Sequence, residues 1–208
     1  MQIESNIPQI GVLALQGAFI EHIQALRALG VPAREVRLPK QLDGLDGLII
    51  PGGESTVIGK LMVKYALDSA MRAFAARGGA IWGTCAGMIL MAREVGREQP
   101  LLELLDIDVE RNAYGSQLHS FEEDVALPNL GIADLRAVFI RAPIVSRVGP
   151  GVTVEARDGA GHIIAVSAEE GRLFATAFHP ELTDDRRLHA RFCAVAARRP
   201  ALAQGSRP

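Results

Sequence analysis

One of the two cysteines in the chain lies in a short turn between two glycines. The stretch AIWGTCAGMILMA (80–92) places Cys85 between Gly83 and Gly87, after a short apolar run and before an apolar, helix-forming run. The spacing G-T-C-A-G is that of the G-x-S-x-G nucleophile elbow, with cysteine in place of serine, and the start of the following helix favours the reactive thiolate. A buried structural thiol in a tight strand–helix crossing is the alternative that this segment alone leaves open.

A histidine and a glutamate, two residues apart, follow a late apolar run. In FHPELTDD (178–185), Pro180 separates His179 from Glu181, so neither side chain is committed to a helix face. A cysteine nucleophile needs a nearby base, and a carboxylate holds the tautomer and orientation of that imidazole. Cys85, His179 and Glu181 together would supply these three roles, although an HPE tripeptide by itself is also an ordinary turn.

A glycine-rich turn, PGGEST (51–56), follows an apolar, strand-like run. It resembles a phosphate-binding loop only superficially. The pattern G-x-x-x-x-G-K-[ST] ending around Lys60 requires glycine at position 54 and serine or threonine at position 61, where the chain has Glu54 and Leu61. Nucleotide binding at this turn is therefore excluded.

The same turn has another use at the edge of a parallel sheet. A glycine-rich turn after a parallel strand exposes backbone N–H groups at the carboxyl edge, where the sites of α/β proteins lie. We expect the N–H groups of Gly53 and Ala86 to form an oxyanion hole. Removal of one such donor typically lowers the rate about 100- to 1000-fold.

Short apolar runs alternate with helical patterns in the first half of the chain. Helices are expected over 19–30, ending at Gly30, and from Leu67 to Gly78-Gly79. The predicted strands are 10–15, 34–38, 47–51 and 80–83. Strand–helix–strand alternation at this spacing predicts an α/β fold with a doubly wound, mostly parallel sheet covered by helices.

The second half of the chain predicts a different arrangement. Turn signals of the kind found in antiparallel hairpins separate the three apolar runs at 152–157, 162–168 and 172–178. A final helix is expected after Thr183-Asp184-Asp185, whose side chains can cap free N–H groups. The domain boundaries that we expect are an N-terminal extension at 1–9, one domain at 10–195 and a disordered tail at 196–208.

Composition excludes several classes of function. The formal net charge is −2, with 49% hydrophobic and 22% charged residues, which gives no basis for a nucleic-acid or membrane-surface partner. Two distant cysteines without C-x-x-C argue against a disulfide framework or a metal site. The first residues lack the basic start of a signal peptide, and no apolar run approaches the roughly 18 to 20 residues that span a bilayer. A cytoplasmic protein without metal or cofactor is the expectation.

The motifs PGGES, GTCAG and HPE, in this order on an α/β pattern, resemble the class I, triad-type glutamine amidotransferases, which have a flavodoxin-like fold. Further blocks narrow the resemblance to the family of glutaminase subunits of two-protein pyridoxal 5′-phosphate synthases. These blocks are GVLALQGAFIEH (11–22), VERNAYGSQ (109–117), VFIRAP (138–143) and HPELTDD (179–185). The resemblance covers roughly residues 10 to 195.

This resemblance implies hydrolysis of glutamine to glutamate and ammonia through a γ-glutamyl thioester on Cys85. His179 would act as base and then as acid, oriented by Glu181. The glutamine-binding residues that it implies are Gly53, Glu54, Ser55, Arg111, Ile140 and Arg141. An arginine suits this substrate because a guanidinium can hold an α-carboxylate through two parallel hydrogen bonds. The resemblance also implies that the segment from Gln16 to His22 lies near a partner interface.

The implied partner is a separate (β/α)₈-barrel synthase that uses the ammonia to make pyridoxal 5′-phosphate. The expected assembly is a hetero-oligomer in which copies of this chain decorate a ring of synthase subunits. Weak activity alone and activation on complex formation are expected, since gating prevents wasteful hydrolysis.

Two positions depart from the family pattern R-N-x-F-G-R-Q-V-D-S-F. The chain reads RNAYGSQLHSF, with Ser116 for arginine and His119 for aspartate, while Tyr114 for phenylalanine is a mild change. The chain therefore lacks an arginine and an aspartate that could pair with each other. We expect this loss to affect local stability or a contact near the site. We interpret His119 as a partly exposed strand residue rather than a catalytic one.

Three other functions remain open at this point. The chain could be the glutaminase subunit of another pathway, a non-catalytic regulatory module, or a cysteine hydrolase or chaperone-like protein of related architecture. Of the remaining candidates, Cys193 is expected to be a packed thiol and His189 to be solvated on the last helix.

Overall fold

The computed structural model describes residues 7–111 and 120–198 of the chain, and within them nine strands form one mixed sheet. The order across this sheet is β2-β1-β3-β4-β11-β10-β8-β5, and β9 pairs with β10. The strands are β1 (Ile10–Leu13), β2 (Ala33–Val36), β3 (Gly47–Ile50), β4 (Ala80–Thr84), β5 (Ile107–Glu110), β8 (Ile144–Val148), β9 (Thr153–Arg157), β10 (Ile163–Ala168) and β11 (Leu173–Thr176).

The strands β2, β1, β3, β4 and β11 are neighbours and all run parallel. This order is the flavodoxin-like 2-1-3-4-5 arrangement, whose ligands bind beyond the carboxyl ends of the strands. Every residue of β1, β3, β4 and β11 is buried, which explains their continuous apolar runs. The edge strand β2 exposes Arg34 and Glu35 instead. The predicted doubly wound sheet is confirmed.

The predicted antiparallel C-terminal portion is also confirmed. β10 pairs antiparallel with β11, β9 and β8, and β8 pairs antiparallel with β5. The strand β11 therefore has two kinds of neighbour, because it is antiparallel to β10 on one side and parallel to β4 on the other. It joins the two halves of the sheet.

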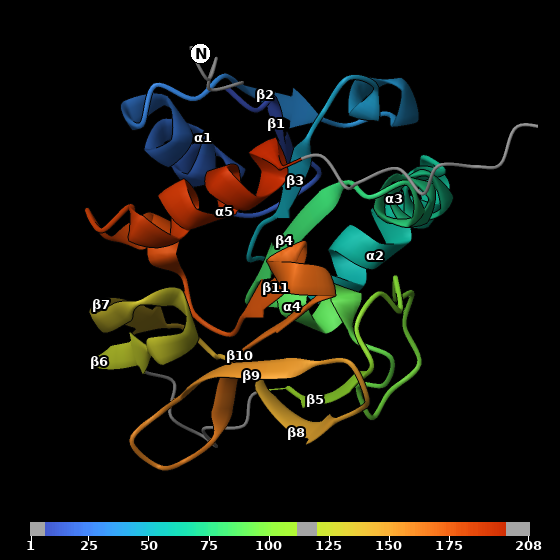
Figure 1. Ribbon diagram of the computed structural model, residues 1–208. Coiled ribbons are helices and arrows are strands. Elements are labelled where there is room, and N and C mark those ends of the chain that lie inside the picture. The colour runs from blue at the N-terminus through green and yellow to red at the C-terminus, as the bar shows by residue number, and fades with distance from the viewer. Residues whose placement is uncertain (1–6, 112–119, 199–208) are drawn as a thin grey trace, which may run out of the picture.

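Helices cover both faces of the parallel strands. In Figure 1, α1 and α5 lie on one face, whereas α2, α3 and α4 lie on the other. The helices are α1 (Phe19–Ala28), α2 (Ser55–Lys64), α3 (Leu67–Ala76), α4 (Ala86–Met91) and α5 (Arg187–Ala197). On the α5 side, the fully buried Trp82 of β4 packs against Phe192 and Phe174, with ring centroids 5.7 and 5.6 Å away.

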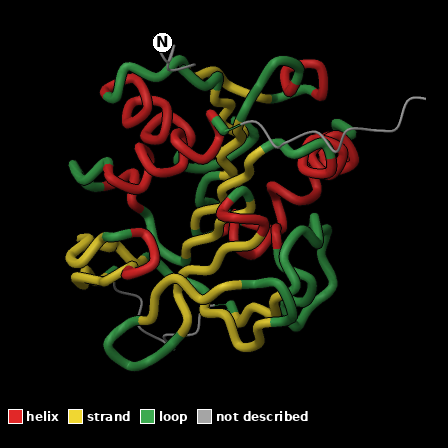
Figure 2. Tube along the Cα trace, in the orientation of Figure 1, coloured by secondary structure: helices red, strands yellow, loops and turns green. Residues whose placement is uncertain are grey.

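A second, two-stranded antiparallel sheet lies beside the main one. It consists of β6 (Phe121–Leu127) and β7 (Ile132–Phe139), and Figure 2 shows it as a separate pair of strands. The rings of Phe121 and Phe139 stack with centroids 4.6 Å apart. The N–H of His179 donates to the carbonyl oxygen of Val138 at 2.9 Å. This hydrogen bond ties β7 to the HPE segment.

The sequence patterns did not predict α2 or the strands β5 to β8. The helix α2 begins directly after the glycine-rich turn, and Glu54 caps it by accepting a hydrogen bond from the N–H of Val57. It is separated from α3 by Ala66, which adopts a left-handed conformation with φ of 54°. The 22-residue stretch 55–76 therefore contains two short helices rather than one long helix.

The last helix extends two residues into the segment that we expected to be a tail. The helix α5 continues to Ala197, and the side chain of Ala196 is buried in the core. Residues 1–6 and 199–208 lie outside the part of the chain that the structure describes. None of the helices described is long and apolar enough to cross a membrane.

Two glycines allow the helix α4 to lie very close to the strands β4 and β3. A Cβ atom on Gly83 would lie 2.5 Å from the carbonyl carbon of Gly87, and one on Gly87 would lie 2.2 Å from the carbonyl oxygen of Ile50. Real Cβ contacts are essentially never shorter than 3.0 Å, and the atoms met here belong to backbone, which cannot rotate away. Both glycines are required for this strand-to-helix turn.

We expect Gly87→Ala to lower the free energy of unfolding by about 1 to 3 kcal/mol, because the added methyl group overpacks the crossing. Gly159→Ala is the matched control, since its Cβ would meet only the movable Glu123 carboxylate. The control should change stability by no more than about 0.5 kcal/mol. Urea unfolding of both variants measures the difference. Equal stabilities would contradict the close crossing.

Candidate active site

The parallel pairing of β4 with β11 brings the cysteine and histidine motifs together. Thr84 and Thr176, the last residues of the two strands, are paired partners in the sheet. The N–H of Cys85 donates to the carbonyl oxygen of Thr176 at 2.8 Å. His179 follows Thr176 by three residues, so both motifs emerge at the carboxyl edge where α/β sites lie.

Cys85 occupies a strained strand-to-helix turn. Its φ is 48° and its ψ is −101°, and it directly precedes the first residue of α4. A non-glycine residue in such a conformation costs roughly 1 to 3 kcal/mol and is found where function requires it. The side chain is 7% exposed, and its Sγ lies 3.9 Å from the carbonyl oxygen of Ile140. This is the geometry of the nucleophile elbow.

His179 is held between the cysteine and a buried glutamate. Its Nδ1 lies 2.7 Å from Oε1 of Glu181, and both residues are buried. Burial alone lowers the pKa of His179, but its hydrogen bonds with Cys85 and Glu181 and their charges outweigh burial and raise that pKa to about 10. A protonated imidazole beside the sulfur stabilises the thiolate.

The glycine-rich turn packs against this histidine. A Cβ on Gly52 would lie 2.2 Å from Cε1 of the His179 ring, so only glycine fits at this position. The next residue, Gly53, is one of the two expected oxyanion donors, and Ala86 is the first residue of α4, where an N–H has no partner within the helix. Gln16 positions this turn, because its Oε1 accepts a hydrogen bond from the N–H of Glu54 at 2.8 Å.

Four side chains near the glycine-rich turn form one polar cluster around the amide of Gln99. Gln99, which sequence reasoning missed, accepts hydrogen bonds at Oε1 from Arg111 at 3.2 Å and from Ser55 at 3.3 Å. Arg111 also pairs with Glu54 at 3.2 Å. Hydrogen bonds from Thr56 and from the backbone of α2, with the nearby Arg111 charge, outweigh burial and lower the pKa of Glu54. Of the predicted glutamine-binding residues, Glu54, Ser55 and Arg111 therefore lie together.

The predicted pair Ile140 and Arg141 follows β7 directly. The carbonyl oxygen of Ile140 faces the cysteine sulfur, as described above. Arg141 has a φ of 47°, a conformation that non-glycine residues rarely adopt, and its side chain is exposed. The strained backbone at Arg141 turns the chain sharply beside Cys85.

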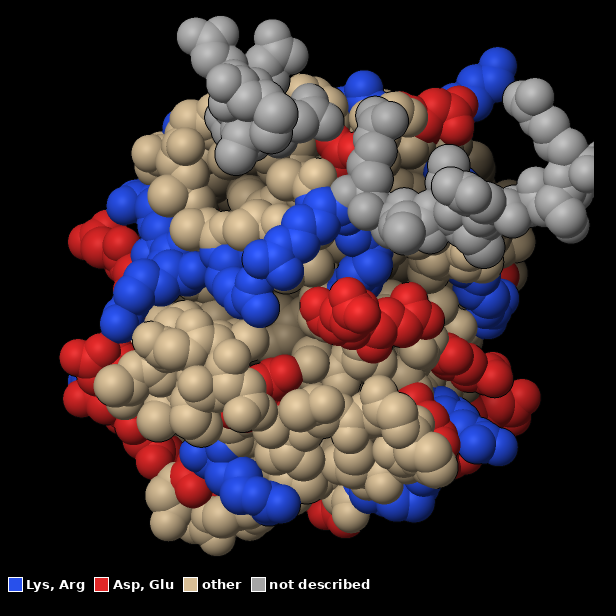
Figure 3. All heavy atoms as spheres, in the orientation of Figure 1, with Lys and Arg blue, Asp and Glu red and all other residues tan. Residues whose placement is uncertain are grey.

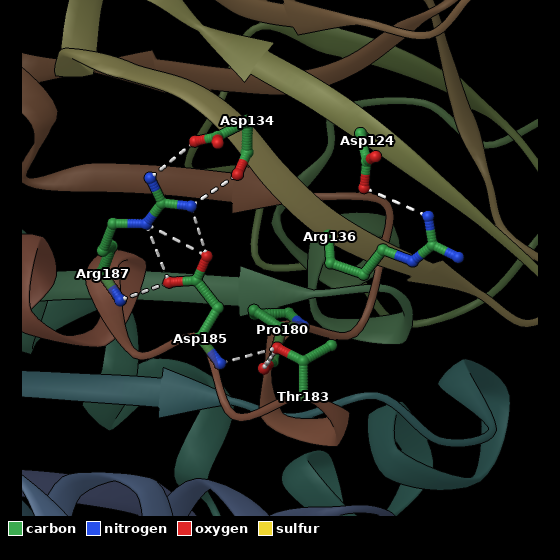
Figure 4. Close-up of polar contacts among 7 residues, drawn as sticks. All are labelled: Asp124, Asp134, Arg136, Pro180, Thr183, Asp185 and Arg187. Carbon is green, nitrogen blue, oxygen red and sulfur yellow. Dashed lines mark hydrogen bonds and ion pairs between the residues drawn. The ribbon is translucent and has the colours of Figure 1, made fainter.

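A network of polar contacts fixes the loop that follows the HPE motif. Figure 4 shows Arg187, the first residue of α5, between Asp185 in the preceding loop and Asp134 on β7, with N–O distances of 2.6 and 2.9 Å. The hydroxyl of Thr183 donates to the carbonyl oxygen of Pro180 at 3.2 Å and accepts from the N–H of Asp185 at the same distance. These contacts anchor the segment after Glu181 to β7 and to the start of α5.

Two histidines singled out from the sequence are fully buried. His22, in the segment expected near a partner interface, is one of them, whereas Gln16 in the same segment is half-buried. His189, expected to be solvated, is fully buried too, so that interpretation is wrong. Cys193 is a packed thiol as predicted, and burial raises its pKa to about 11. Ser116, His119 and Tyr114 lie outside the described residues.

The charges at the surface are mixed in sign. On the face in Figure 3, a band of Lys and Arg side chains borders groups of Asp and Glu side chains. Within residues 7–111 and 120–198, no group of three or more His, Cys, Asp or Glu side chains is placed to hold a metal ion.

Comparison with known proteins decides the family. The model of the SNO glutamine amidotransferase family matches residues 12–197. The chain belongs to this family. A protein of Herpetosiphon aurantiacus named "Pyridoxal 5'-phosphate synthase subunit PdxT" is 54% identical over 187 residues, which cover 88% of this chain and 97% of that protein. A protein of the same name from Roseiflexus castenholzii is 52% identical over 186 residues, with the same coverage.

A solved structure supports the same assignment. The structure titled "Crystal structure of glutamine amidotransferase" superimposes with a TM-score of 0.85 at 48% identity, covering 90% of this chain and 98% of that one. The chain is thus a triad-type glutamine amidotransferase with the flavodoxin-like sheet of its family, and the expectation from the motifs is confirmed.

Acid should weaken the fold through His189. Burial lowers its pKa from 6.5 to about 3, so the unfolded chain takes up this proton at a higher pH than the folded protein does. Stability therefore falls as the pH drops below 6.5, by up to about 2 kcal/mol for this group at pH 5. His22, whose pKa burial also lowers, acts in the same direction.

Urea unfolding between pH 6.5 and 5 measures this slope, and His189→Gln should reduce it. His179 leaves the slope unaffected, because the stability from its raised pKa is fully present below pH 6.5 and is lost only as the pH rises toward 10. Identical slopes in the wild type and the variant would show that His189 takes up its proton at an ordinary pH.

Proposed function

We propose that this chain is the glutaminase subunit of a pyridoxal 5′-phosphate synthase and that Cys85, His179 and Glu181 are its catalytic residues. The observation that carries the assignment of residues is the elbow cysteine beside a buried histidine–glutamate pair. Support for the pathway comes from relatives named as subunits of that synthase, which match the chain over 97% of their length. A catalytic thiol must stay reduced, so the cytoplasm is the proposed location.

The reaction begins at the side-chain amide of glutamine. The Cys85 thiolate attacks the carbonyl carbon, and the oxygen takes up the electron pair opposite the N–H groups of Gly53 and Ala86. The C–N bond then breaks, His179 gives its proton to the nitrogen, and ammonia leaves. Cys85 is left as a γ-glutamyl thioester.

The second half of the reaction releases glutamate. Neutral His179 removes a proton from a water molecule, and the resulting hydroxide attacks the thioester carbon. Collapse of this intermediate breaks the C–S bond and restores the thiolate and the protonated imidazole. Glu181 stabilises the charge on His179 in both halves through the 2.7 Å contact with Nδ1.

The substrate's charged end is assigned to the cluster around Gln99. The Arg111 guanidinium suits the α-carboxylate of glutamine, and the Glu54 carboxylate suits the α-ammonium. Ser55, at the start of α2, completes this cluster through its contact with Gln99. Ile140 and Arg141 are assigned to the opposite wall, since the carbonyl oxygen of Ile140 faces the cysteine.

The ammonia is proposed to pass to a separate (β/α)₈-barrel synthase subunit. In bulk water it would be protonated and diluted, so a shielded path across an interface is needed. Gln16 is the half-buried residue of the proposed interface segment that reaches the site, because its side chain holds the glycine-rich turn. Docking at this segment can therefore align the oxyanion donors. We propose a hetero-oligomer in which this chain decorates a ring of synthase subunits.

Ammonia release from glutamine, with and without the synthase subunit from the same organism, tests this proposal. We expect slow release by the chain alone and faster release in the complex. Full activity alone, with no response to the synthase, would contradict the gating. No release under either condition would contradict the glutaminase itself.

Cys85→Ala should abolish ammonia release while the complex with the synthase still forms, because the substitution removes the nucleophile and little volume. Cys193→Ala is the matched control, since this second buried thiol lies on α5, away from the elbow. The control should retain wild-type kcat. Release that persists in Cys85→Ala would assign the reaction to another group.

Glu181→Gln should lower kcat by about 10³- to 10⁴-fold, since an amide can donate to Nδ1 and stabilise the wrong tautomer of His179. The KM for glutamine should change little, because Glu181 touches no predicted substrate contact. Steady-state kinetics of the complex provide both constants. An unchanged kcat would exclude a triad that depends on Glu181.

A further inference from the structure

Two buried histidines lie behind the proposed triad, on helices far apart in sequence. His22 belongs to α1 and His189 to α5, and both side chains are fully buried. The two rings lie 5.2 Å apart, and each lies edge-on to the indole of Trp82 on β4, at 5.7 and 5.0 Å. The mechanism described above uses neither of them.

The two histidines continue the line of contacts from the catalytic cysteine. Nε2 of His22 lies 3.4 Å from Oε2 of Glu181, the carboxylate oxygen that His179 does not use, and 3.2 Å from the hydroxyl of Thr84. Nδ1 of His22 lies 3.0 Å from Nε2 of His189. Thr84 immediately precedes Cys85. His22 thus contacts the residues next to both ends of the triad.

The chemistry of these atoms selects one arrangement of hydrogens. A carboxylate oxygen only accepts hydrogen bonds, and among the described residues Oε2 of Glu181 is buried without a hydrogen-bond partner, while Nε2 of His22 lies 3.4 Å from it. The His22 nitrogen that faces it must therefore carry the hydrogen. Nδ1 of His22 is then an acceptor and receives the Nε2–H of His189. We therefore assign both rings as neutral Nε2–H tautomers, in which the hydrogen of His189 faces His22 and the hydrogen of His22 lies on the nitrogen nearest Glu181 and Thr84.

We propose that His22, held in its tautomer by His189, is a positioning residue that fixes the Glu181 carboxylate so that its other oxygen meets Nδ1 of His179. This inference rests on the proposed glutaminase function. His22 touches no substrate and acts only through Glu181. Groups that support a catalytic side chain in this way typically contribute about 10- to 100-fold to activity.

The electrostatic surroundings keep the two rings neutral. Burial lowers the pKa of His22, and the His179 charge lowers it further, whereas Glu181 and Glu21 act in the opposite direction. Burial, His22 and Arg186 likewise outweigh Glu181 and lower the pKa of His189 to about 3. A neutral His22 donates one hydrogen bond without competing with His179 as a second cation.

The test compares the steady-state kinetics of His22→Leu and His22→Gln in the complex with the synthase. Leucine has a volume similar to that of histidine but no hydrogen-bond donor. The side-chain amide of glutamine has an N–H group at about the same distance from the backbone as Nε2 of histidine. We expect His22→Leu to lower kcat about 10- to 100-fold with an unchanged KM, and His22→Gln to restore most of the loss. Cys193→Ala, a buried change on the helix that carries His189, is the control and should retain wild-type kcat.

The pH profile separates positioning from a merely structural effect. If the Glu181 carboxylate turns away in His22→Leu, His179 loses part of the interaction that raises its pKa. The alkaline limb of kcat/KM should then move to lower pH in His22→Leu and stay in place in Cys193→Ala. Wild-type kcat and an unmoved limb in His22→Leu would overturn the proposal. An inactive wild type would instead overturn the glutaminase function on which it rests.

The side-chain nitrogen spectrum of the wild-type protein needs neither activity nor a variant. Long-range ¹H–¹⁵N correlations at pH 7 should show His22 and His189 as neutral rings protonated at Nε2. A ring of His22 protonated at Nδ1, or at both nitrogens, would overturn the proposed arrangement even if His22→Leu failed to fold.

Discussion

The parallel pairing of β4 with β11 is the constraint on which the site depends. It pairs Thr84 with Thr176, which lie more than ninety positions apart in the chain, and the N–H of Cys85 donates a hydrogen bond to the carbonyl oxygen of Thr176. The strand β11 pairs antiparallel with β10, and this hairpin places β11 beside β4. One role of the second half of the chain is therefore to supply the last strand of the parallel sheet. Because β11 lies beside β4, His179 lies beside the strand-to-helix turn that carries Cys85. The turns after β1 and β3 lie at the same carboxyl edge of the sheet.

The second physical theme is that the proposed chemistry takes place among buried groups. His179 and Glu181 are each 7% exposed, so their mutual attraction is little screened by water, but each also needs a partner for every polar atom. The backbone of Cys85 is strained, and Gly52 of the glycine-rich turn lies in close contact with the ring of His179. The rings of His22 and His189 then fill the space behind the carboxylate with neutral donors. Folding and catalytic geometry therefore rely on the same contacts.

Local patterns in the sequence predicted the parts of the site that are local in space. The elbow follows from Gly83 and Gly87 on either side of Cys85, and the buried parallel strands follow from continuous apolar runs. The pairing of His22 with His189 spans 167 positions, which no local pattern reveals. A signal for burial was nevertheless present, since His189 shares one face of its helix with Phe192 and Cys193. The helix α2 was missed because its start coincides with the functional turn, and β6 and β7 because their exposed acidic and basic residues obscure the apolar alternation.

The central claim is that Cys85 forms a covalent γ-glutamyl thioester, and trapping this intermediate tests it most directly. The complex with the synthase is mixed with glutamine, quenched in acid and digested. The masses of the peptides that contain Cys85 and Cys193 are then measured by mass spectrometry. The account predicts a γ-glutamyl adduct on the Cys85 peptide alone, appearing within one turnover and absent from Cys85→Ala. Ammonia release without any adduct on Cys85, or an adduct on another residue, would contradict it.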